Sequence, residues 1–208
     1  MNSNAQEKRT SWPIMEHFYT IQGEGFHSGR PAYFIRTGGC DVGCVWCDVK
    51  ESWNAADHSP MHLTDIIQVI KESACNFVVI TGGEPAMYEL SVLVNALHAL
   101  QIETAIETSG CYPLDAAVNW YCFSPKKFKP PVQEAYEKAD ELKVVIFHRS
   151  DFEWAEEHAA RIRNNNCKLY LQPEWSKEDE MLPAIINYVK ENPKWSISLQ
   201  THKYMQIP

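Results

Sequence analysis

Seven short apolar segments constrain the fold of this chain more than any other feature of its sequence. They span residues 32–37, 76–81, 104–108, 120–123, 142–147, 168–171 and 196–199. Between them, the apolar spacing of amphipathic helices is found in residues 62–73, 85–97, 151–163 and 181–190. Strands that alternate with helices form parallel βα units. Six or seven strands are too few for a closed eight-stranded barrel, so the pattern predicts one α/β domain over residues 1–208, built as an open or partial (β/α) TIM-like barrel.

The ends of these predicted strands share a second property. Small or polar residues follow most of them: GGC at 38–40, TGGEP at 81–85, ETSG at 107–110, SPK at 124–126 and QPE at 172–174. Parallel strands place their carboxyl ends at one edge of a sheet, and ligand sites form at that edge. We therefore expect these five segments to meet around one functional site.

Bulk properties disfavour several classes of function. The 208 residues carry a formal net charge of −8, whereas a broad nucleic-acid-binding surface is basic. No uninterrupted apolar run is long enough to span a bilayer, and residues 1–12 lack the apolar core of a signal peptide. We expect a cytoplasmic protein that binds neither nucleic acid nor membrane, with a mobile polar segment at residues 1–12.

Three of the seven cysteines are clustered. Cys40, Cys44 and Cys47 form a C-x3-C-x2-C run after a predicted strand, in a loop whose glycines allow it to curl tightly. Thiolates are the usual ligands of iron–sulfur clusters, which mostly have four. Three thiolates with no obvious fourth predict a cluster with one iron left open for substrate chemistry.

Other interpretations of these cysteines stay open at this point. A structural zinc site needs four ligands, and His58 or His62 is a candidate for the fourth. A redox dithiol would need only Cys44 and Cys47. The other cysteines are isolated in sequence, and we expect them to be buried thiols: Cys75, Cys111, Cys122 and Cys167.

The C-x3-C-x2-C run has an aromatic residue before its last cysteine and resembles the signature of the radical S-adenosylmethionine (SAM) superfamily. The GGE at 82–84 resembles that superfamily's second motif. From residue 14 to 208 the chain is further similar to the 7-carboxy-7-deazaguanine synthase family. This similarity is carried by FYTIQGEGFHSGRPAYFIR, VITGGEP, IETSG, SPK, LQP and the ending QTHKYMQIP. The resemblance implies a radical SAM core fold.

The same resemblance implies an activity. It indicates a lyase of queuosine and 7-deazapurine biosynthesis that converts 6-carboxy-5,6,7,8-tetrahydropterin to 7-carboxy-7-deazaguanine and releases ammonia. It also implies a [4Fe-4S] cluster, SAM, a homodimer, and a flavodoxin or ferredoxin as electron donor. The alternatives are another small radical SAM enzyme, such as a glycyl-radical activase, and a zinc-stabilised binding module.

Matching positions assign roles toward the cluster and SAM. The cluster ligands, which are also the catalytic residues, are Cys40, Cys44 and Cys47. The glycines of GGE would allow close approach, and Glu84 would accept from the SAM ammonium; without the resemblance, GGE is a turn with a solvated carboxylate. The SAM-binding positions are Trp46, Cys47, Asp48, Gly82, Gly83, Glu84, Ser109, Ser124, Pro125, Lys126, Gln172, Pro173, Glu174 and Trp175.

Matching positions also imply a substrate site. Arg36 lies in an apolar strand and needs an anionic partner, which is either a substrate carboxylate or an internal ion pair. In the family, the terminal carboxylate of a proline such as Pro208 reaches the substrate. The substrate-binding positions are Ile21, Gln22, Gly23, Glu24, Arg36, Thr81 and Pro208.

The chain departs from the family at one position. Family members often have a threonine that binds Mg²⁺ two residues after the last cluster cysteine, and this chain has Val49 there. Valine has no side-chain oxygen, so Mg²⁺ is a weakened expectation: substrate oxygens and water would hold it. Alternatively, Lys50 or another cation replaces its charge.

Overall fold

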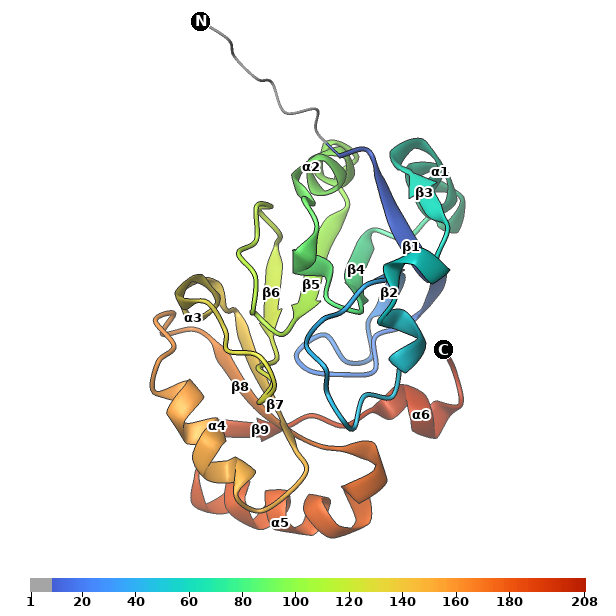
Figure 1. Ribbon diagram of the computed structural model, residues 1–208. Coiled ribbons are helices and arrows are strands. Elements are labelled where there is room, and N and C mark those ends of the chain that lie inside the picture. The colour runs from blue at the N-terminus through green and yellow to red at the C-terminus, as the bar shows by residue number, and fades with distance from the viewer. Residues whose placement is uncertain (1–8) are drawn as a thin grey trace, which may run out of the picture.

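The computed structural model describes residues 9–208 and contains one nine-stranded sheet (Figure 1). The strands are β1 (Ser11–Ile21), β2 (Pro31–Thr37), β3 (Pro60–His62), β4 (Phe77–Gly82), β5 (Glu103–Thr108), β6 (Trp120–Phe123), β7 (Glu141–Ile146), β8 (Lys168–Pro173) and β9 (Trp195–Ile197). Their spatial order is β3-β1-β2-β4-β5-β6-β7-β8-β9. The pairings from β2 to β9 are all parallel, while β1 is antiparallel to both of its neighbours.

The connections between parallel strands place helices against the sheet. The α-helices are α1 (Leu63–Ser73), α2 (Ser91–Ala99), α3 (Gln133–Lys138), α4 (Asp151–Ala159), α5 (Glu178–Glu191) and α6 (Thr201–Met205). Helix α2 packs on β5, α4 on β7, and α5 on β8 and β9, which gives the outer layer of a partial (β/α) barrel (Figure 1). Within residues 9–208, no helix is long and apolar enough to cross a membrane.

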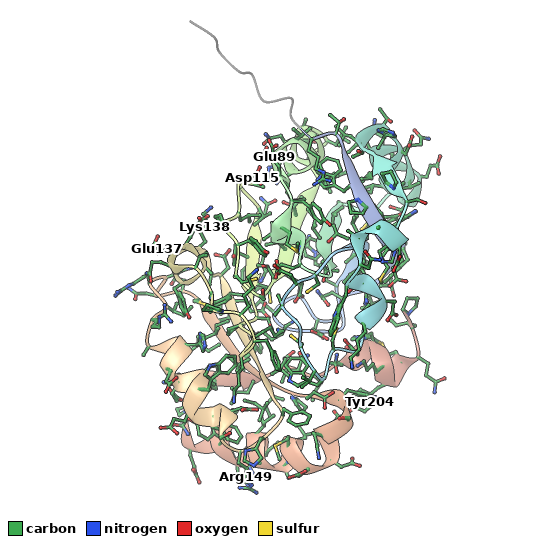
Figure 2. All side chains as sticks on the ribbon, viewed as in Figure 1. Glu89, Asp115, Glu137, Lys138, Arg149 and Tyr204 are labelled. Atoms are coloured by element: carbon green, nitrogen blue, oxygen red, sulfur yellow. The ribbon has the colours of Figure 1, made fainter. Side chains whose placement is uncertain are left out.

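Successive side chains of a strand point to opposite faces, and this alternation separates the core from the site. In β2 and β7, Ile35, Leu142 and Val144 join the large apolar core beneath the helices. Arg36 and Lys143, the residues next to them, line a pocket instead. Charged side chains such as Glu137 and Arg149 lie at the exposed rim of the molecule (Figure 2).

All seven predicted strands are confirmed, each within two residues of its expected ends. The two strands that the sequence analysis did not assign are β1 and β3, which are the antiparallel ones. Strand β3 has only three residues, and β1 contains Pro13 and loses its regular register between Ile14 and Glu16. Neither therefore shows the continuous apolar run that identified the parallel strands.

The predicted helix over residues 85–97 is wrong at its start. Residues Pro85–Met87 form a separate 3-10 turn, and α2 begins only at Ser91. The carboxylate of Asp115 accepts hydrogen bonds from the backbone N–H groups of Leu90 (2.9 Å) and Ser91 (3.3 Å). A residue more than twenty positions away thus satisfies the helix start, which local sequence cannot indicate.

Further differences lie at short elements and at the N-terminus. Two 3-10 turns, η1 (Lys50–Ser52) and η2 (Ala55–Asp57), lie between the cysteines and β3. Helix α4 ends at Ala159 rather than at residue 163, and α3 and α6 were not predicted. Of the expected mobile segment, residues 1–8 lie outside the described residues. For Ser11 and Trp12 the expectation is wrong. Both belong to β1, and Trp12 is fully buried and donates from Nε1 to the carbonyl of Glu89 (2.9 Å).

His158 makes the stability of this fold sensitive to acid. Its ring is stacked on Tyr136, and Nδ1 lies 2.8 Å from the Tyr136 hydroxyl. Burial lowers the pKa of His158 from 6.5 to about 4, because the charged ring would lose its hydration. The unfolded chain therefore binds more protons than the native chain between these two values, and stability falls as the pH falls across that window.

We predict that the free energy of unfolding decreases by about 3 kcal/mol from neutral pH to pH 4 through this group alone. Urea unfolding at several pH values measures it. His158→Gln should flatten this part of the profile, whereas His148→Gln, at an exposed position, should not. Parallel profiles for all three proteins would contradict the assignment.

Candidate active site

The carboxyl ends of the parallel strands surround one pocket of about 260 Å³. Every site residue predicted from the sequence lines this pocket except Pro125, which is buried between two residues that do line it. The pocket thus brings together segments from residue 21 to residue 208, as expected from strand ends that meet at one edge. The roles of individual residues stay predictions.

The three clustered cysteines lie in a loop directly after β2, which we call the cysteine loop (residues 38–48). Its start is fixed by backbone hydrogen bonds from Gly39 N–H to the carbonyl of Ser52 (2.6 Å) and from Cys40 N–H to that of Trp53 (3.1 Å). Cys44 is buried, and Cys40 and Cys47 are half-buried. All three line the same pocket wall, so the loop presents three thiols to one space.

This donor set fits an iron–sulfur cluster. Thiolate sulfur is the ligand that such clusters prefer. Burial raises the pKa of Cys40, and it raises that of Cys44 to about 11, so these thiols stay protonated until a metal displaces the protons. Across residues 9–208, no three His, Cys, Asp or Glu side chains are placed to hold a single metal ion.

The zinc ligands considered from the sequence lie elsewhere. His58 donates from Nε2 to the carbonyl of Glu51 (2.8 Å), and neither His58 nor His62 lines the pocket. Of the isolated cysteines, three are buried as expected and Cys167 is only half-buried, because it lies in the turn before β8.

The GGE segment at the end of β4 packs directly on the cysteine loop. Gly83 N–H donates to the carbonyl of Thr37 (2.8 Å), and Glu84 N–H donates to that of Gly39 (2.9 Å). A side chain at Gly83 would overlap the Gly39 carbonyl and crowd Cys40. Gly82 has φ 118°, a conformation that favours glycine. The two sequence motifs are therefore parts of one structural unit.

Glu84 is not the solvated carboxylate that a simple turn would have. Its side chain is buried, and four hydrogen bonds reach its two oxygens. Oε1 accepts from Ala86 N–H (3.1 Å) and the Thr108 hydroxyl (2.5 Å), and Oε2 accepts from the Ser109 N–H (2.8 Å) and hydroxyl (2.5 Å). This carboxylate therefore joins the end of β4 to the end of β5 while lining the pocket.

The SPK segment after β6 lies beside the cysteine loop. Lys126 Nζ donates to the carbonyl (2.7 Å) and hydroxyl (2.5 Å) of Ser124, and it lies 5.8 Å from the ring centre of Trp46. Burial lowers the pKa of Lys126. An aromatic ring and an ammonium group thus line the same part of the pocket.

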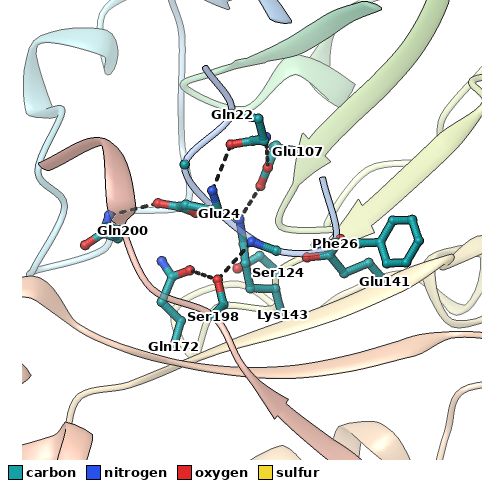
Figure 3. A network of polar contacts seen from close by, with 12 residues as sticks. Gln22, Glu24, Phe26, Glu107, Ser124, Glu141, Lys143, Gln172, Ser198 and Gln200 are labelled. Carbon is teal, nitrogen blue, oxygen red and sulfur yellow. Dashed lines mark hydrogen bonds and ion pairs between the residues drawn. The ribbon is translucent and has the colours of Figure 1, made fainter. Parts of the chain in front are cut away.

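A network of polar side chains lines the same pocket (Figure 3). The QGEG loop after β1 inserts into the barrel, where Glu24 reaches Lys143 of β7 (2.6 Å). The backbone N–H of Glu24 donates to Gln22 Oε1 (3.1 Å), and the side-chain amide of Gln22 donates to Glu107 Oε1 (3.2 Å). We call the set of five side chains in these contacts the polar network: Gln22, Glu24, Glu107, Lys143 and Gln200.

Arg36 lies beside this network with its guanidinium incompletely paired. Its Nε is 3.3 Å from Glu16 Oε1, but within residues 9–208 this buried nitrogen makes no hydrogen bond of good geometry. The side chain also lies over the ring of Phe18. The internal ion pair considered from the sequence exists, and it leaves donor capacity toward the pocket.

The last residues of the chain close one side of the pocket. Thr201 N–H donates to the carbonyl of Gly23 (2.9 Å), which fixes α6 on the QGEG loop. Pro208 lines the pocket, and its main-chain carboxylate oxygen accepts from the Thr20 hydroxyl (3.3 Å).

Sequence reasoning assigned no role to six polar residues of the pocket, although two of them belong to the ETSG segment expected at the site. They are Ser52, Glu107, Thr108, Lys143, Gln200 and His202. A signal existed for Lys143, because a lysine inside an apolar strand needs an anionic partner, as Arg36 does. Gln200 and His202 lie in the QTHKYMQIP ending that carries the family resemblance, but no role was assigned to them, because short C-terminal segments are usually polar tails.

The segment after Cys47 does not fit a Mg²⁺ site made of side chains. Val49 lines the pocket but has no oxygen. Asp48 Oδ2 accepts from Lys203 Nζ (3.0 Å), so the cation beside this carboxylate is Lys203 rather than Lys50. The structure therefore supplies a lysine charge where a metal ligand was in question.

Comparison with known proteins agrees with this geometry. Residues 34–181 match the model of the Radical SAM superfamily. The fold, the cysteine loop and the GGE unit define a radical SAM protein, a class that implies a [4Fe-4S] cluster and SAM. The 7-carboxy-7-deazaguanine synthase of Flavobacterium psychrophilum is 57% identical over 98% of this chain and 96% of that protein, and that of Escherichia coli K12 is 34% identical over 94% and 99%. The chain belongs to the 7-carboxy-7-deazaguanine synthase family.

A solved structure gives the same result for the fold. The crystal structure of QueE from Escherichia coli has a TM-score of 0.79 and 32% identity, and the match covers 91% of this chain and 93% of that one. The partial-barrel prediction is confirmed by this likeness and by the strand order.

The contact between GGE and the cysteine loop leads to a testable prediction. Gly83→Ala places a methyl group against the Gly39 carbonyl, so we expect it to lower the free energy of unfolding by about 1–3 kcal/mol and to reduce cluster binding. Iron and sulfide content after anaerobic reconstitution measures the effect. Gly29→Ala is the control, because its methyl group meets open space and only its φ of 88° is unfavourable. Full iron loading of Gly83→Ala would refute the prediction.

Proposed function

We propose that this chain is a lyase that converts 6-carboxy-5,6,7,8-tetrahydropterin to 7-carboxy-7-deazaguanine with loss of ammonia, in queuosine and 7-deazapurine biosynthesis. The observation that carries the proposal is a single pocket that is lined both by three cysteine thiols and by the polar network. Relatives of the same length that carry the name of this synthase support it.

In this proposal, Cys40, Cys44 and Cys47 hold the cluster and leave one iron free for the amino and carboxylate groups of SAM. When bound, the reduced cluster would supply one electron for the reductive cleavage of SAM. The chain's own contribution is to position the reactants and to exclude water. Backbone packing of Gly83 against the cysteine loop fixes the position of that loop, and Trp46 with Lys126 lines the region proposed for the nucleoside.

The substrate is proposed to lie between the cluster and the polar network. The incompletely paired guanidinium of Arg36 would bind the substrate carboxylate. Carboxylates at Glu24 and Glu107, together with Pro208, would accept from the N–H groups of the pterin's 2-amino-4-oxo edge. Thr81 would add a hydroxyl beside the GGE segment.

The partners and the compartment belong to the same proposal. We propose a homodimer, in which a second copy covers part of the open barrel, and a flavodoxin or ferredoxin that delivers the electron. We propose a cytoplasmic location, supported by seven cysteines that are all free thiols in the described chain.

The proposed reaction is tested with anaerobically reconstituted protein, SAM, a reductant and the carboxytetrahydropterin. We expect mass spectrometry to detect 7-carboxy-7-deazaguanine, and Cys44→Ser to reduce its formation by at least about 1000-fold because a hydroxyl is a poor ligand for iron–sulfur clusters. Cys167→Ser, outside the pocket, is the control. SAM cleavage without the deazaguanine acid would reject the substrate but keep the superfamily. Glycyl-radical formation on a partner protein, or stoichiometric zinc without iron, would favour the alternative functions.

Mg²⁺ remains a proposed cofactor held by substrate oxygens and water. Because Val49 has no oxygen and Asp48 is paired with Lys203, we expect Mg²⁺ to stimulate turnover in chelated buffer by less than about threefold. Val49→Thr restores a ligand and should increase this stimulation. Turnover that depends fully on Mg²⁺ in the unsubstituted protein would contradict the expectation.

A further inference from the structure

Lys143 is buried more deeply than any other lysine or arginine in residues 9–208. Its side chain is 3% exposed, although it lies in the middle of β7 between two core residues. A lysine in such a place is stable only with charged or strongly polar partners. The role of Lys143 therefore lies in what its ammonium group holds.

The ammonium joins two carboxylates from different parts of the chain (Figure 3). Nζ lies 2.6 Å from Glu24 Oε2 of the QGEG loop and 2.7 Å from Glu107 Oε2 of β5. The remaining oxygens are also held: Gln200 donates to Glu24 Oε1 (2.9 Å), and Gln22 donates to Glu107 Oε1 (3.2 Å). Both carboxylates keep about a fifth of their side-chain surface exposed, and both line the pocket.

Other titratable groups surround this ion-paired unit. Burial raises the pKa of Glu141 and of the Cys122 thiol, which favours their neutral forms. Burial lowers the pKa of His202, which favours the neutral ring, and it lowers that of Lys126 beyond β6. Within the ion-paired unit itself, two carboxylates face one ammonium.

Without the ammonium, this arrangement would not persist. Burial by itself raises the pKa of Glu24, but the charge and hydrogen bond of Lys143 outweigh it and bring that pKa to about 2. Two buried carboxylates with no cation between them cannot both stay ionised, because each disfavours the charge of the other. A protonated carboxyl would lose acceptor capacity.

We propose that Lys143 is a positioning residue: its ammonium holds Glu24 and Glu107 together as a pair of hydrogen-bond acceptors that selects heterocycles with adjacent N–H donors. This inference rests on the proposed function, and it assigns the selection of the 2-amino-4-oxo edge to one ion-paired unit. Each of these oxygens accepts from one group of the chain and has a second lone pair for a ligand. A ring without the 2-amino group leaves one of these lone pairs without a donor, which lowers the affinity of a closed site.

The test measures equilibrium binding of 7-carboxy-7-deazaguanine, the proposed product, to cluster-loaded enzyme with SAM by anaerobic calorimetry between pH 6 and 8. Unsubstituted enzyme should change its affinity less than about threefold over this range. Lys143→Met should bind about 10- to 100-fold more weakly at pH 6 and recover part of that loss toward pH 8, because the unpaired carboxyls now titrate. A purely structural role would lower affinity equally at every pH.

Lys138→Met removes an ion-paired lysine of α3 outside the pocket and should behave like the unsubstituted enzyme. If Lys143→Met does not fold, Glu107→Gln replaces it, since Lys143 then keeps Glu24 as a partner. Glu107→Gln should weaken binding of the product about tenfold but leave unchanged the binding of an analogue without the 2-amino group. An unaltered affinity and pH profile in Lys143→Met, or equal effects of Glu107→Gln on both ligands, overturns the proposal. Failure of the unsubstituted enzyme to form product would instead reject the reaction, and the binding comparison would still decide the role of Lys143.

Discussion

Two backbone hydrogen bonds connect the end of β4 to the end of β2, and the site depends on them. Gly83 and Glu84 donate to the carbonyls of Thr37 and Gly39, so the GGE segment fixes the position from which the cysteine loop departs. This contact is possible because β2 and β4 are parallel neighbours that end at the same level. The absence of a side chain at Gly83 allows the two backbones to meet. The glycine of the GGE motif is thus explained by the close approach of the β4 backbone to the cysteine loop.

Glu84 extends this connection to a third strand. Its carboxylate receives hydrogen bonds from Thr108 and Ser109 at the end of β5, and burial makes each of them costly to leave unmade. The ends of β2, β4 and β5 are therefore joined by hydrogen bonds along one edge of the pocket. The polar network extends the same principle to β7, where Lys143 replaces backbone groups as the connecting element.

The sequence allowed the parallel sheet and most of the pocket to be predicted, for a physical reason. Strands buried on both faces are continuous apolar runs, and their small or polar ends mark the edge where a site forms. Features that depend on distant partners were not visible. Strand β1 pairs through an irregular register, α2 is capped by Asp115, and Lys143 finds partners 119 and 36 positions away. In each case the deciding interaction is made in space, and no local pattern carries it.

The QGEG loop inside the barrel has a consequence for the order in which the molecule is assembled. The three thiols lie within eight consecutive residues, and the backbone hydrogen bonds that hold their loop involve only residues between Pro13 and Glu84. The polar side of the pocket is made of residues from Gln22 to His202, and these come together only when the last strands have docked. The cysteine loop can therefore bind metal before the polar network has formed. A partly folded chain of this kind would carry the reactive centre without the residues that select its substrate.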